Sequence, residues 1–236
     1  TSGGTTTSGG TTTSGGTTTS GGVMTSAGAP TSGGVSTFPS GGNAPGGGVA
    51  GTSGTSGSGS GACSCPIGTA CIGGACVPGK IVFVTSQRTV NPAFGGVSGG
   101  DQLCADLATA ASLPGQYLVW LSDMHTSPAA RFSRSTIPYI LVSGAVLAND
   151  WADLVDGQLN VPINVDEQGV SVPFVEVWTG TLADGTESAD TCKNWKSTTA
   201  ADVATQGVTD LVNTGWTAIY TQFCDRTQIA LLCFEQ

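Results

Sequence analysis

The charges of this chain are confined to one part of it, and this limits what each part can fold into. No Asp, Glu, Lys or Arg occurs before Lys80, so all 7 basic and 16 acidic residues lie in Lys80–Gln236. The earlier residues are mainly Gly, Thr and Ser, and they offer too little apolar surface to offset the entropy of folding. The remaining residues, about 157, suffice for one packed core. We therefore expect a non-globular N-terminal segment followed by one globular domain.

The net charge of −9 limits the partners of that domain. It opposes binding to nucleic acid, to heparin-like polyanions and to anionic membrane surfaces. The chain also lacks the run of about 18 apolar residues that a transmembrane helix needs. We expect neither nucleic acid as a partner nor a membrane span.

The cysteines are even in number and indicate the environment of the protein. Eight cysteines beside a Ser/Thr-rich tract favour four disulfides in a secreted or cell-surface, extracellular protein. Zinc binding by the first four is disfavoured, because one residue separates Cys63 from Cys65 and no His is near. The eight are Cys63, Cys65, Cys71, Cys76, Cys104, Cys192, Cys224 and Cys233.

The first 62 residues form a low-complexity stalk or arm. Thr1–Gly22 is TSGG followed by copies of TTTSGG, and Val23–Ala62 is a less regular Gly/Ser/Thr tract. The repeat has no apolar residue to bury, so three alternatives stay open: a flexible tether, an O-glycosylated stalk, or an extended strand ordered by something outside itself. No N-x-S/T sequon occurs, so any sugars are O-linked. The candidate sites are Thr5, Thr6, Thr7, Ser8, Thr11, Thr12, Thr13, Ser14, Thr17, Thr18, Thr19 and Ser20.

Residues 63–79 form a small four-cysteine collar between the arm and the domain that follows. A piece this short has no hydrophobic core, so two local disulfides would hold it together. Three pairings are possible, and the sequence does not choose among them. We favour Cys63 with Cys71 and Cys65 with Cys76, by analogy with the interleaved bridges of small EGF-like turns.

Residues 80–236 have the pattern of a globular head with one main helix. The helix is expected at 101–112, with Asp101 in its first turn and Cys104 pointing inward. In 228–234 both faces are apolar, which predicts a central strand. Further strands are expected at 81–86, 117–122, 137–142 and 216–220, with a short amphipathic turn at 149–156, a loop or weak helix at 202–214, and a turn holding Cys224 at 221–226.

The stretch from Val177 to Ser197 reads as a core corner of the head. It combines an apolar strand carrying Trp178, a Gly- and Asp-rich turn, and Cys192 three residues before Trp195. The other three tryptophans, Trp120, Trp151 and Trp216, are also expected in the core. An exposed Trp would instead favour glycan binding.

Four blocks of the head resemble endostatin, the C-terminal domain of certain collagens, and a group of bacterial surface proteins with a C-type-lectin-like fold. The blocks are GVSGGDQLC, SLPGQYLVWLSD, VWTGTLADGTESADTCKNWKS and CDRTQIALLCFEQ. The resemblance covers about Lys80–Gln236. It implies an α+β domain with a mixed sheet and nested disulfides, Cys104 with Cys233 and Cys192 with Cys224. Such an outer bridge would tie the helix to the final strand and close a long loop.

The chain also departs from these families where they bind ligands. The N-terminal histidines that bind zinc in endostatin have no counterpart, since the only histidine is His125 in a loop. An acidic domain replaces endostatin's arginine-rich heparin surface. The calcium-site triplets of sugar-binding C-type lectins are absent, and the nearest string, Asn194-Trp195-Lys196, has a cation where a carboxylate is needed. The resemblance therefore implies the fold more than an activity.

The sequence contains no recognisable catalytic motif, and we expect that the protein is not an enzyme. A Ser/His/Asp arrangement would have to use His125, and no G-x-S-x-G motif surrounds any serine. Structural calcium is the more plausible addition, with Asp184, Glu187 and Asp190 or the loop 164–169 as oxygen-rich candidates. Neither stretch has the calcium-loop pattern, so hydrated loops are favoured and no cofactor is expected.

Two functional hypotheses follow from these observations. In the first, the protein is a non-catalytic structural subunit of, or decoration on, a cell-surface filament or layer. Its O-glycosylated arm would then contact copies of itself. In the second, it is a stalked adhesin whose lectin-like head binds a glycan or a cell-surface protein.

Overall fold

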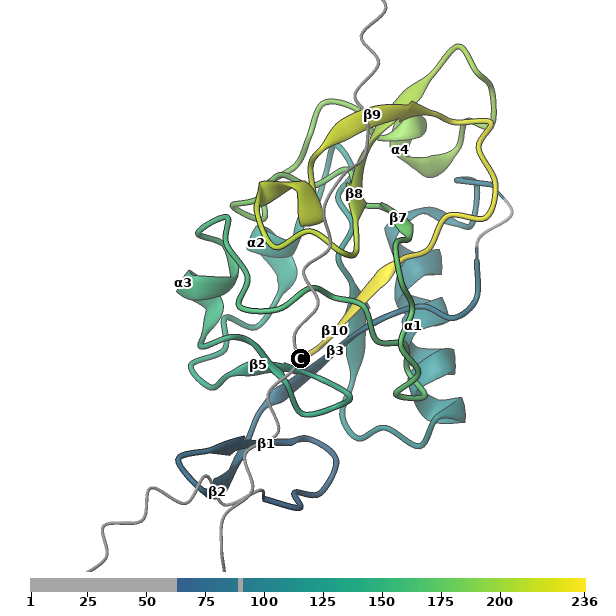
Figure 1. The fold of residues 1–236 in the computed structure, drawn as a ribbon. Helices are drawn as coiled ribbons and strands as arrows, with labels where there is room; N and C mark the ends of the chain where they lie inside the picture. The colour runs from purple at the N-terminus through teal and green to yellow at the C-terminus, as the bar shows by residue number, and fades with distance from the viewer. Residues whose placement is uncertain (1–62, 89–90) are drawn as a thin grey trace, which may run out of the picture. The chain divides into compact units, whose positions relative to one another are not determined.

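A computed structural model describes residues 63–88 and 91–236, all within one compact unit, Ser56–Gln236 (Figure 1). The arm and its predicted glycosylation sites lie outside the described residues. The unit is α+β, with three sheets, one long helix and several helical turns. The strands are β1 (Thr69–Ile72), β2 (Ala75–Pro78), β3 (Lys80–Val84), β4 (Tyr117–Val119), β5 (Tyr139–Leu141), β6 (Val146–Ala148), β7 (Glu176–Trp178), β8 (Val203–Val208), β9 (Tyr220–Phe223) and β10 (Leu232–Glu235). The helices are α1 (Gly96–Ala110), α2 (Pro128–Arg131), α3 (Trp151–Leu154), α4 (Cys192–Trp195) and the 3-10 helix η1 (Thr214–Trp216).

The main sheet has five strands in the order β4-β10-β3-β5-β6. It is mixed, because β10 is antiparallel to both its neighbours while β3 and β5 are parallel. The last strand is therefore flanked on both sides, which confirms the central position predicted from its two apolar faces. The strand begins at Leu232 rather than at residue 228, because Ala230 forms an isolated bridge with Val177 of β7 instead.

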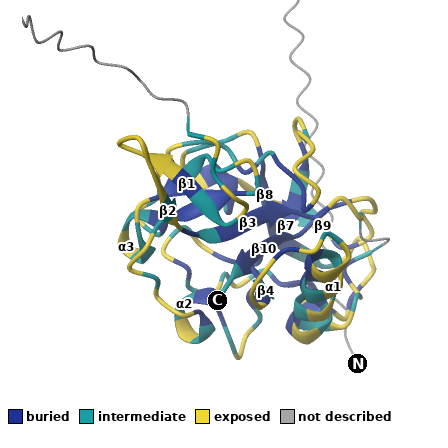
Figure 2. Cartoon of the chain, turned by 90° about the horizontal axis from the view of Figure 1, so that it is seen from below, coloured by how far each residue is buried: buried dark blue, intermediate teal, exposed yellow. Residues whose placement is uncertain are grey.

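Each face of the main sheet covers its own hydrophobic cluster. Ile81 and Phe83 point into one cluster, which helix α1 closes with Cys104 and Ala108. Val82 and Val84 point into the other cluster, which contains aromatic side chains such as Trp120. Figure 2 shows the sheet strands largely as buried residues and the outer side of α1 as exposed ones. The alternation of side chains along a strand accounts for the two clusters, since neighbouring residues point to opposite faces.

A second sheet has three strands in the order β7-β8-β9, all antiparallel. It touches the main sheet through the bridge between Val177 and Ala230. The middle strand, β8, is buried along most of its length, whereas most of β9 is exposed and no described strand flanks its outer side. Figure 1 shows these three strands beside one another.

The collar is a β-hairpin that packs on the head. Strands β1 and β2 are antiparallel, with Cys71 opposite Cys76. Ala70 is buried in the cluster under α1, and Gly79 is so close to the head that a Cβ there would lie 2.8 Å from Ile140 Cγ2. The sequence suggested a collar held by disulfides alone, and the structure adds these packing contacts.

Helix α1 begins five residues earlier than predicted, at Gly96. Asp101 is therefore not in the first turn, and its carboxylate instead accepts the backbone N–H of Val119 at 2.9 Å. Gly99 and Gly100 lie inside this longer helix, although glycine is a poor helix former. Packing explains both glycines, because a Cβ at Gly100 would lie 2.8 Å from the Val119 side chain and one at Gly99 would lie 2.0 Å from the Phe94 carbonyl oxygen.

Two of the expected elements near the C-terminus are wrong. The segment 202–214, expected as loop or weak helix, contains strand β8, and 216–220, expected as a strand, follows the 3-10 helix η1. The chain becomes extended only at β9, inside the range predicted to be a turn around Cys224. Polar residues in β8 concealed a strand, although Gln206 is fully buried.

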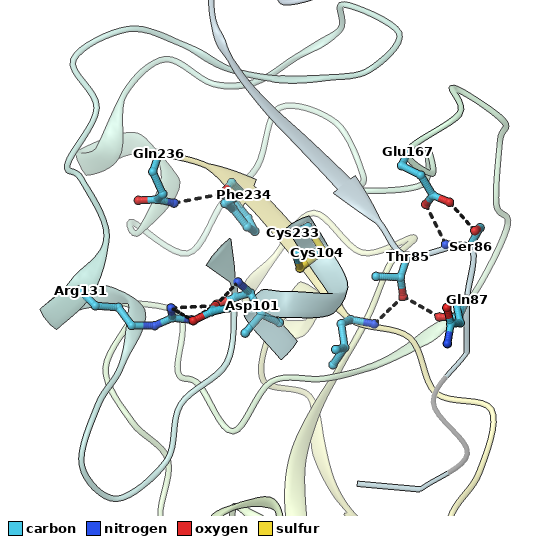
Figure 3. Close-up of a disulfide and its surroundings, with 12 residues drawn as sticks. Thr85, Ser86, Gln87, Asp101, Cys104, Arg131, Glu167, Cys233, Phe234 and Gln236 are labelled. Carbon is cyan, nitrogen blue, oxygen red and sulfur yellow. Dashed lines mark hydrogen bonds and ion pairs between the residues drawn. A yellow bond between two sulfur atoms is a disulfide. The ribbon is translucent and has the colours of Figure 1, made fainter. Parts of the chain in front are cut away.

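Four disulfides stabilise the described unit. The structure joins Cys104 to Cys233 and Cys192 to Cys224, which are the pairs that the resemblance implies, and places the other four cysteines in the collar as Cys63–Cys71 and Cys65–Cys76. Figure 3 shows the bridge from α1 to β10, which spans 129 residues of sequence. A crosslink that closes so long a loop restricts the unfolded chain strongly.

Candidate functional site

The least ordinary backbone in the head lies at residues 192–195. All four have positive φ angles, between 48° and 60°, although none is glycine. They form one turn of left-handed helix, a conformation that costs L-residues on the order of 1 kcal/mol each. The surrounding structure must therefore hold this turn in place.

Several contacts hold the left-handed turn. The Cys192–Cys224 disulfide anchors its first residue to the segment after β9. The Thr191 carbonyl accepts the backbone N–H of Trp195 at 2.8 Å, and the Thr191 hydroxyl accepts the N–H of Asn194 at 3.3 Å. The indole N–H of Trp195 donates to the buried carbonyl of Ser122 at 2.8 Å. These bonds hold the Trp195 side chain in the core and leave the neighbouring Lys193 and Lys196 exposed.

A hollow of about 810 Å³ lies on one side of this turn, and we call it the α1 hollow. The start of helix α1 forms one wall, the loop after β4 forms another, and the left-handed turn closes the third side. It is lined by Ala93, Gly95, Gly96, Val97, Ser98, Asp101, Asp123, His125, Thr126, Arg131, Asn194, Trp195 and Lys196.

One charge pair inside the α1 hollow is structural. The Arg131 guanidinium donates to both carboxylate oxygens of Asp101, at 2.9 and 3.0 Å, and also to the Val119 carbonyl (Figure 3). Asp101 in turn accepts the Val119 N–H, so the pair joins α1, α2 and β4. The positive charge that remains for a ligand comes from Lys196, which is exposed and belongs to none of the ion pairs found in the described part of the chain.

The only histidine also faces the α1 hollow. His125 is exposed, in a loop that Asp123 stabilises by accepting the backbone N–H groups of His125 and Thr126 at 2.8 and 2.9 Å. The imidazole makes no hydrogen bond to a serine or a carboxylate among the residues that the structure describes. This geometry suits contact with a ligand and does not form a nucleophile–base pair.

A smaller hollow of about 450 Å³ lies on the other side of the left-handed turn. Lys193 and Asp202 form an ion pair across it at 3.0 Å. The Ser197 hydroxyl and the Lys193 ammonium hold the pKa of Asp202 below its ordinary value. The Asp202 carboxylate is thus already paired with the side chains of Ser197 and Lys193.

The structure does not gather the calcium candidates into one site. Asp184 accepts the N–H and the hydroxyl of Thr186, at 2.9 and 2.6 Å, and these bonds lower its pKa. In the described ranges, three or more potential metal ligands converge only at Cys63, Cys65 and Cys71, all in disulfides. Glu187 and Asp190 do not join Asp184 in such a group.

Four of the five tryptophans lie in the core. Trp120, Trp178, Trp195 and Trp216 are at most 1% exposed. Trp151 is only partly buried, and the Arg134 guanidinium lies over its ring at 5.9 Å from the centroid. The observed positions therefore leave no freely exposed tryptophan as a sugar-stacking surface in the described head.

Sequence reasoning missed the left-handed turn and the role of Arg131. No residue type in Cys192–Trp195 signals positive φ apart from Asn194, since asparagine tolerates this conformation better than most. Arg131 lies thirty residues from Asp101 in the sequence, and only the fold brings the two together.

Comparison of the chain with protein-family models and with curated proteins finds no match. None of the helices in the described residues is both long and apolar enough to cross a membrane. The functional argument therefore rests on the residues and geometry of the chain itself.

Proposed function

We propose that this protein is a non-catalytic, extracellular structural protein, a subunit of or decoration on a cell-surface filament or layer. Its lectin-like head would be carried on the uncharged, O-glycosylated Thr/Ser/Gly arm. The observation that supports this most is the contrast between an arm without charges and a collar and head that together hold four disulfides. Disulfides of this density are typical of secreted proteins.

The proposal includes a C-type-lectin-like, endostatin-like fold for residues 80–236. In its support, one main helix packs on a mixed sheet, a disulfide joins that helix to the central strand, and a second disulfide lies within the C-terminal half. An experimental structure of the head, superposed on C-type-lectin-like domains, tests this. A different strand order around β10 would refute it.

Intact-mass measurement of native material tests the arm. We expect mass increments of single sugar units, with peptide mapping placing them on the Thr and Ser residues of the repeat. Unmodified native material would remove the glycosylated-stalk part of the proposal. Native copies that are found only as isolated chains would remove the assembly part.

A second function, ligand binding by a stalked adhesin, is favoured by the α1 hollow. The free Lys196 and the exposed His125 lie in it beside the left-handed turn, whose backbone strain is typical of sites that hold a ligand. The partner would be a glycan or a cell-surface protein.

A glycan array with the full chain tests this second function. Binding should be lost on Lys196→Ala and retained on Arg134→Ala, because Arg134 is an exposed cation outside the hollow. Binding that both variants weaken equally, or no binding at all, would count against a glycan site in the hollow.

A further inference from the structure

We propose that the exposed edge of β9 pairs with the β9 edge of a second copy of this chain. The three-stranded sheets of two heads would then form one continuous sheet. This inference rests on the proposed function, because it supplies a contact between copies in an assembly. It depends only on residues of the head.

The backbone of β9 has one residue free to pair outward. Strand β8 occupies one side of β9, with Gln206 opposite Tyr220 and Ala204 opposite Gln222, and Cys224 donates its N–H to the Asp202 carbonyl at 3.0 Å. Since the hydrogen bonds of antiparallel strands alternate between the two sides, residues 220, 222 and 224 bond to β8. Residues 221 and 223 therefore point away from it.

Of these two outward residues, Thr221 is the available one. The N–H of Phe223 donates to the Gln222 side chain at 3.0 Å, and the carbonyl of Phe223 accepts the N–H of Arg226 at 3.2 Å. For Thr221, neither backbone group has an outward partner among the hydrogen bonds of residues 63–88 and 91–236. An exposed strand edge with such groups is a template for another strand.

The edge lacks the features that usually prevent pairing. Strand β9 reads Tyr-Thr-Gln-Phe, without the lysine, the proline or the inward charge that protects many edge strands. Tyr220 is 40% exposed and Phe223 52% exposed, and Ile219 next to the strand is 45% exposed. In a head of net charge −9, this uncharged strand lets two copies approach without placing like charges opposite each other.

The strand is also complementary to itself. Two copies can pair in antiparallel fashion about a two-fold axis at Thr221. The Thr221 residues of the two copies then face each other and share two N–H···O bonds. Tyr220 then lies opposite Gln222, and Phe223 of one copy lies alongside Ile219 of the other. The same apolar residues that are exposed in one copy become covered in the pair.

The short strand makes this a weak contact by itself. A contact of four residues from each copy buries well below the roughly 1,200 Å² of a standard stable interface. Heads held on one surface or filament, however, meet at effective concentrations on the order of millimolar, where weak contacts are populated. The contact therefore suits lateral association of many copies.

Analytical ultracentrifugation of the full chain, up to about 1 mM, measures this association. We expect a reversible dimer in the wild type and a loss of affinity of about tenfold or more in Thr221→Pro, because proline removes the N–H that both bonds of the pair require. The fold should tolerate this change, since the Thr221 N–H faces away from β8. Phe223→Lys should also weaken the dimer, while Phe174→Lys, at an aromatic residue 61% exposed outside the edge, should not.

Disulfide trapping tests the register of the pair. A two-fold axis at Thr221 places the two Thr221 Cα atoms about 5.5 Å apart, within reach of a disulfide. Thr221→Cys should therefore form an intermolecular crosslink much faster than Thr198→Cys, which is also exposed but lies outside the edge. Peptide mapping checks that the four native disulfides stay intact.

Three results would overturn the inference: a wild-type chain that stays monomeric at about 1 mM, a dimer that Thr221→Pro leaves unchanged, or equal trapping of the two cysteine variants. Association that survives in Thr221→Pro would assign the contact to another part of the chain and leave the proposed structural function standing. Absence of sugars on the arm would weaken that function and leave the β9 result unaffected.

Discussion

The two sheets of the head differ in how they are stabilised. In the five-stranded sheet, β3 and β10 are buried on both faces, and a disulfide ties the second of them to helix α1. In the three-stranded sheet β7 and β8 are largely buried, whereas β9 is an exposed edge. Both sheets contribute to the core, and the three-stranded sheet also offers a surface along β9. We expect substitutions in the buried strands to affect mainly folding and substitutions in β9 to affect mainly association.

The largest effect should come from the two disulfides of the head. Replacing Cys104 and Cys233 together by alanine should lower the free energy of unfolding by about 5 kcal/mol, because that bridge closes a 129-residue loop in the unfolded chain. The matched loss of Cys192 and Cys224, which are 32 residues apart, should cost about 4 kcal/mol. Urea unfolding measures both values, and a larger loss from the second pair would contradict the loop-size argument.

Aromatic residues of the two sheets should respond very differently to truncation. Trp120 is fully buried, contacts several aromatic rings and donates its indole N–H to Thr217 at 2.8 Å. Trp120→Ala should therefore cost about 3–5 kcal/mol of stability. Phe223→Ala should cost less than about 0.5 kcal/mol, because half of the ring is already exposed. Comparable losses at both sites in thermal or urea unfolding would show that β9 is part of the core.

Within the three-stranded sheet, a substitution in β8 should cost more stability than one in β9, because the backbone of β8 lies very close to another segment. A Cβ at Gly207 would lie 2.1 Å from the Trp216 carbonyl oxygen, so Gly207→Ala forces the backbone apart. We expect a loss of about 1–3 kcal/mol. Thr221→Ala on β9 serves as the control and should stay within about 0.5 kcal/mol of the wild type. If Gly207→Ala were neutral, the two segments would have to be less tightly packed than they are in this structure.

The smallest effect concerns Glu176 of β7, which accepts a hydrogen bond from Tyr220 of β9. Although burial raises the pKa of Glu176, hydrogen bonds from the Tyr220 hydroxyl and Arg226 hold it below its ordinary value. A carboxylate with a lowered pKa stabilises the fold above its unfolded pKa, and this contribution is lost as the pH falls through the folded value. Tyr220→Phe should therefore reduce the acid-induced loss of stability below about pH 5, by well under 1 kcal/mol.

The hydrogen bond between Tyr220 and Glu176 can also be tested at high pH, where the Tyr220 phenol titrates. Burial, followed by the hydrogen bond to Glu176, raises the pKa of Tyr220 to about 12. The contact is thus stable up to the ordinary pKa of tyrosine and is lost as the pH rises toward 12. Spectrophotometric titration of the phenol, with Tyr220→Phe as the reference, measures it. A tyrosine that titrated at its ordinary pKa would show that this hydrogen bond does not form.

The sequence predicted the continuously apolar strands well and the elements that contain polar residues or glycine poorly. Strands β3 and β10 were recognisable because continuous apolar runs indicate strands covered on both faces. Strand β8 was missed because Gln206 and Gly207 interrupt its apolar pattern, and Gly207 is required by the close approach of the Trp216 carbonyl. The start of α1 was missed for the same reason, since its glycines serve packing against Val119 and Phe94.

The candidate site could be predicted less than the fold. His125 and Lys196 were visible as rare charged or titratable residues in an acidic domain, but nothing showed that they share a hollow. That arrangement depends on four successive positive φ angles, and local sequence preferences do not encode such a turn. Tertiary bonds to Ser122 and Cys224 impose it.

The central place of β10 affects how the head can be made during protein synthesis. This strand comes after every other element of the head in sequence, yet it lies between β4 and β3, and Lys80 at the other end of the domain donates to the carbonyl of Gln236. A growing chain has no strand to fill that gap until residues 232–235 have left the ribosome, and Cys104 has no partner until then. The head is thus expected to fold only once β10 has been synthesised, so a product truncated before Leu232 should be degraded rather than accumulate as a folded domain.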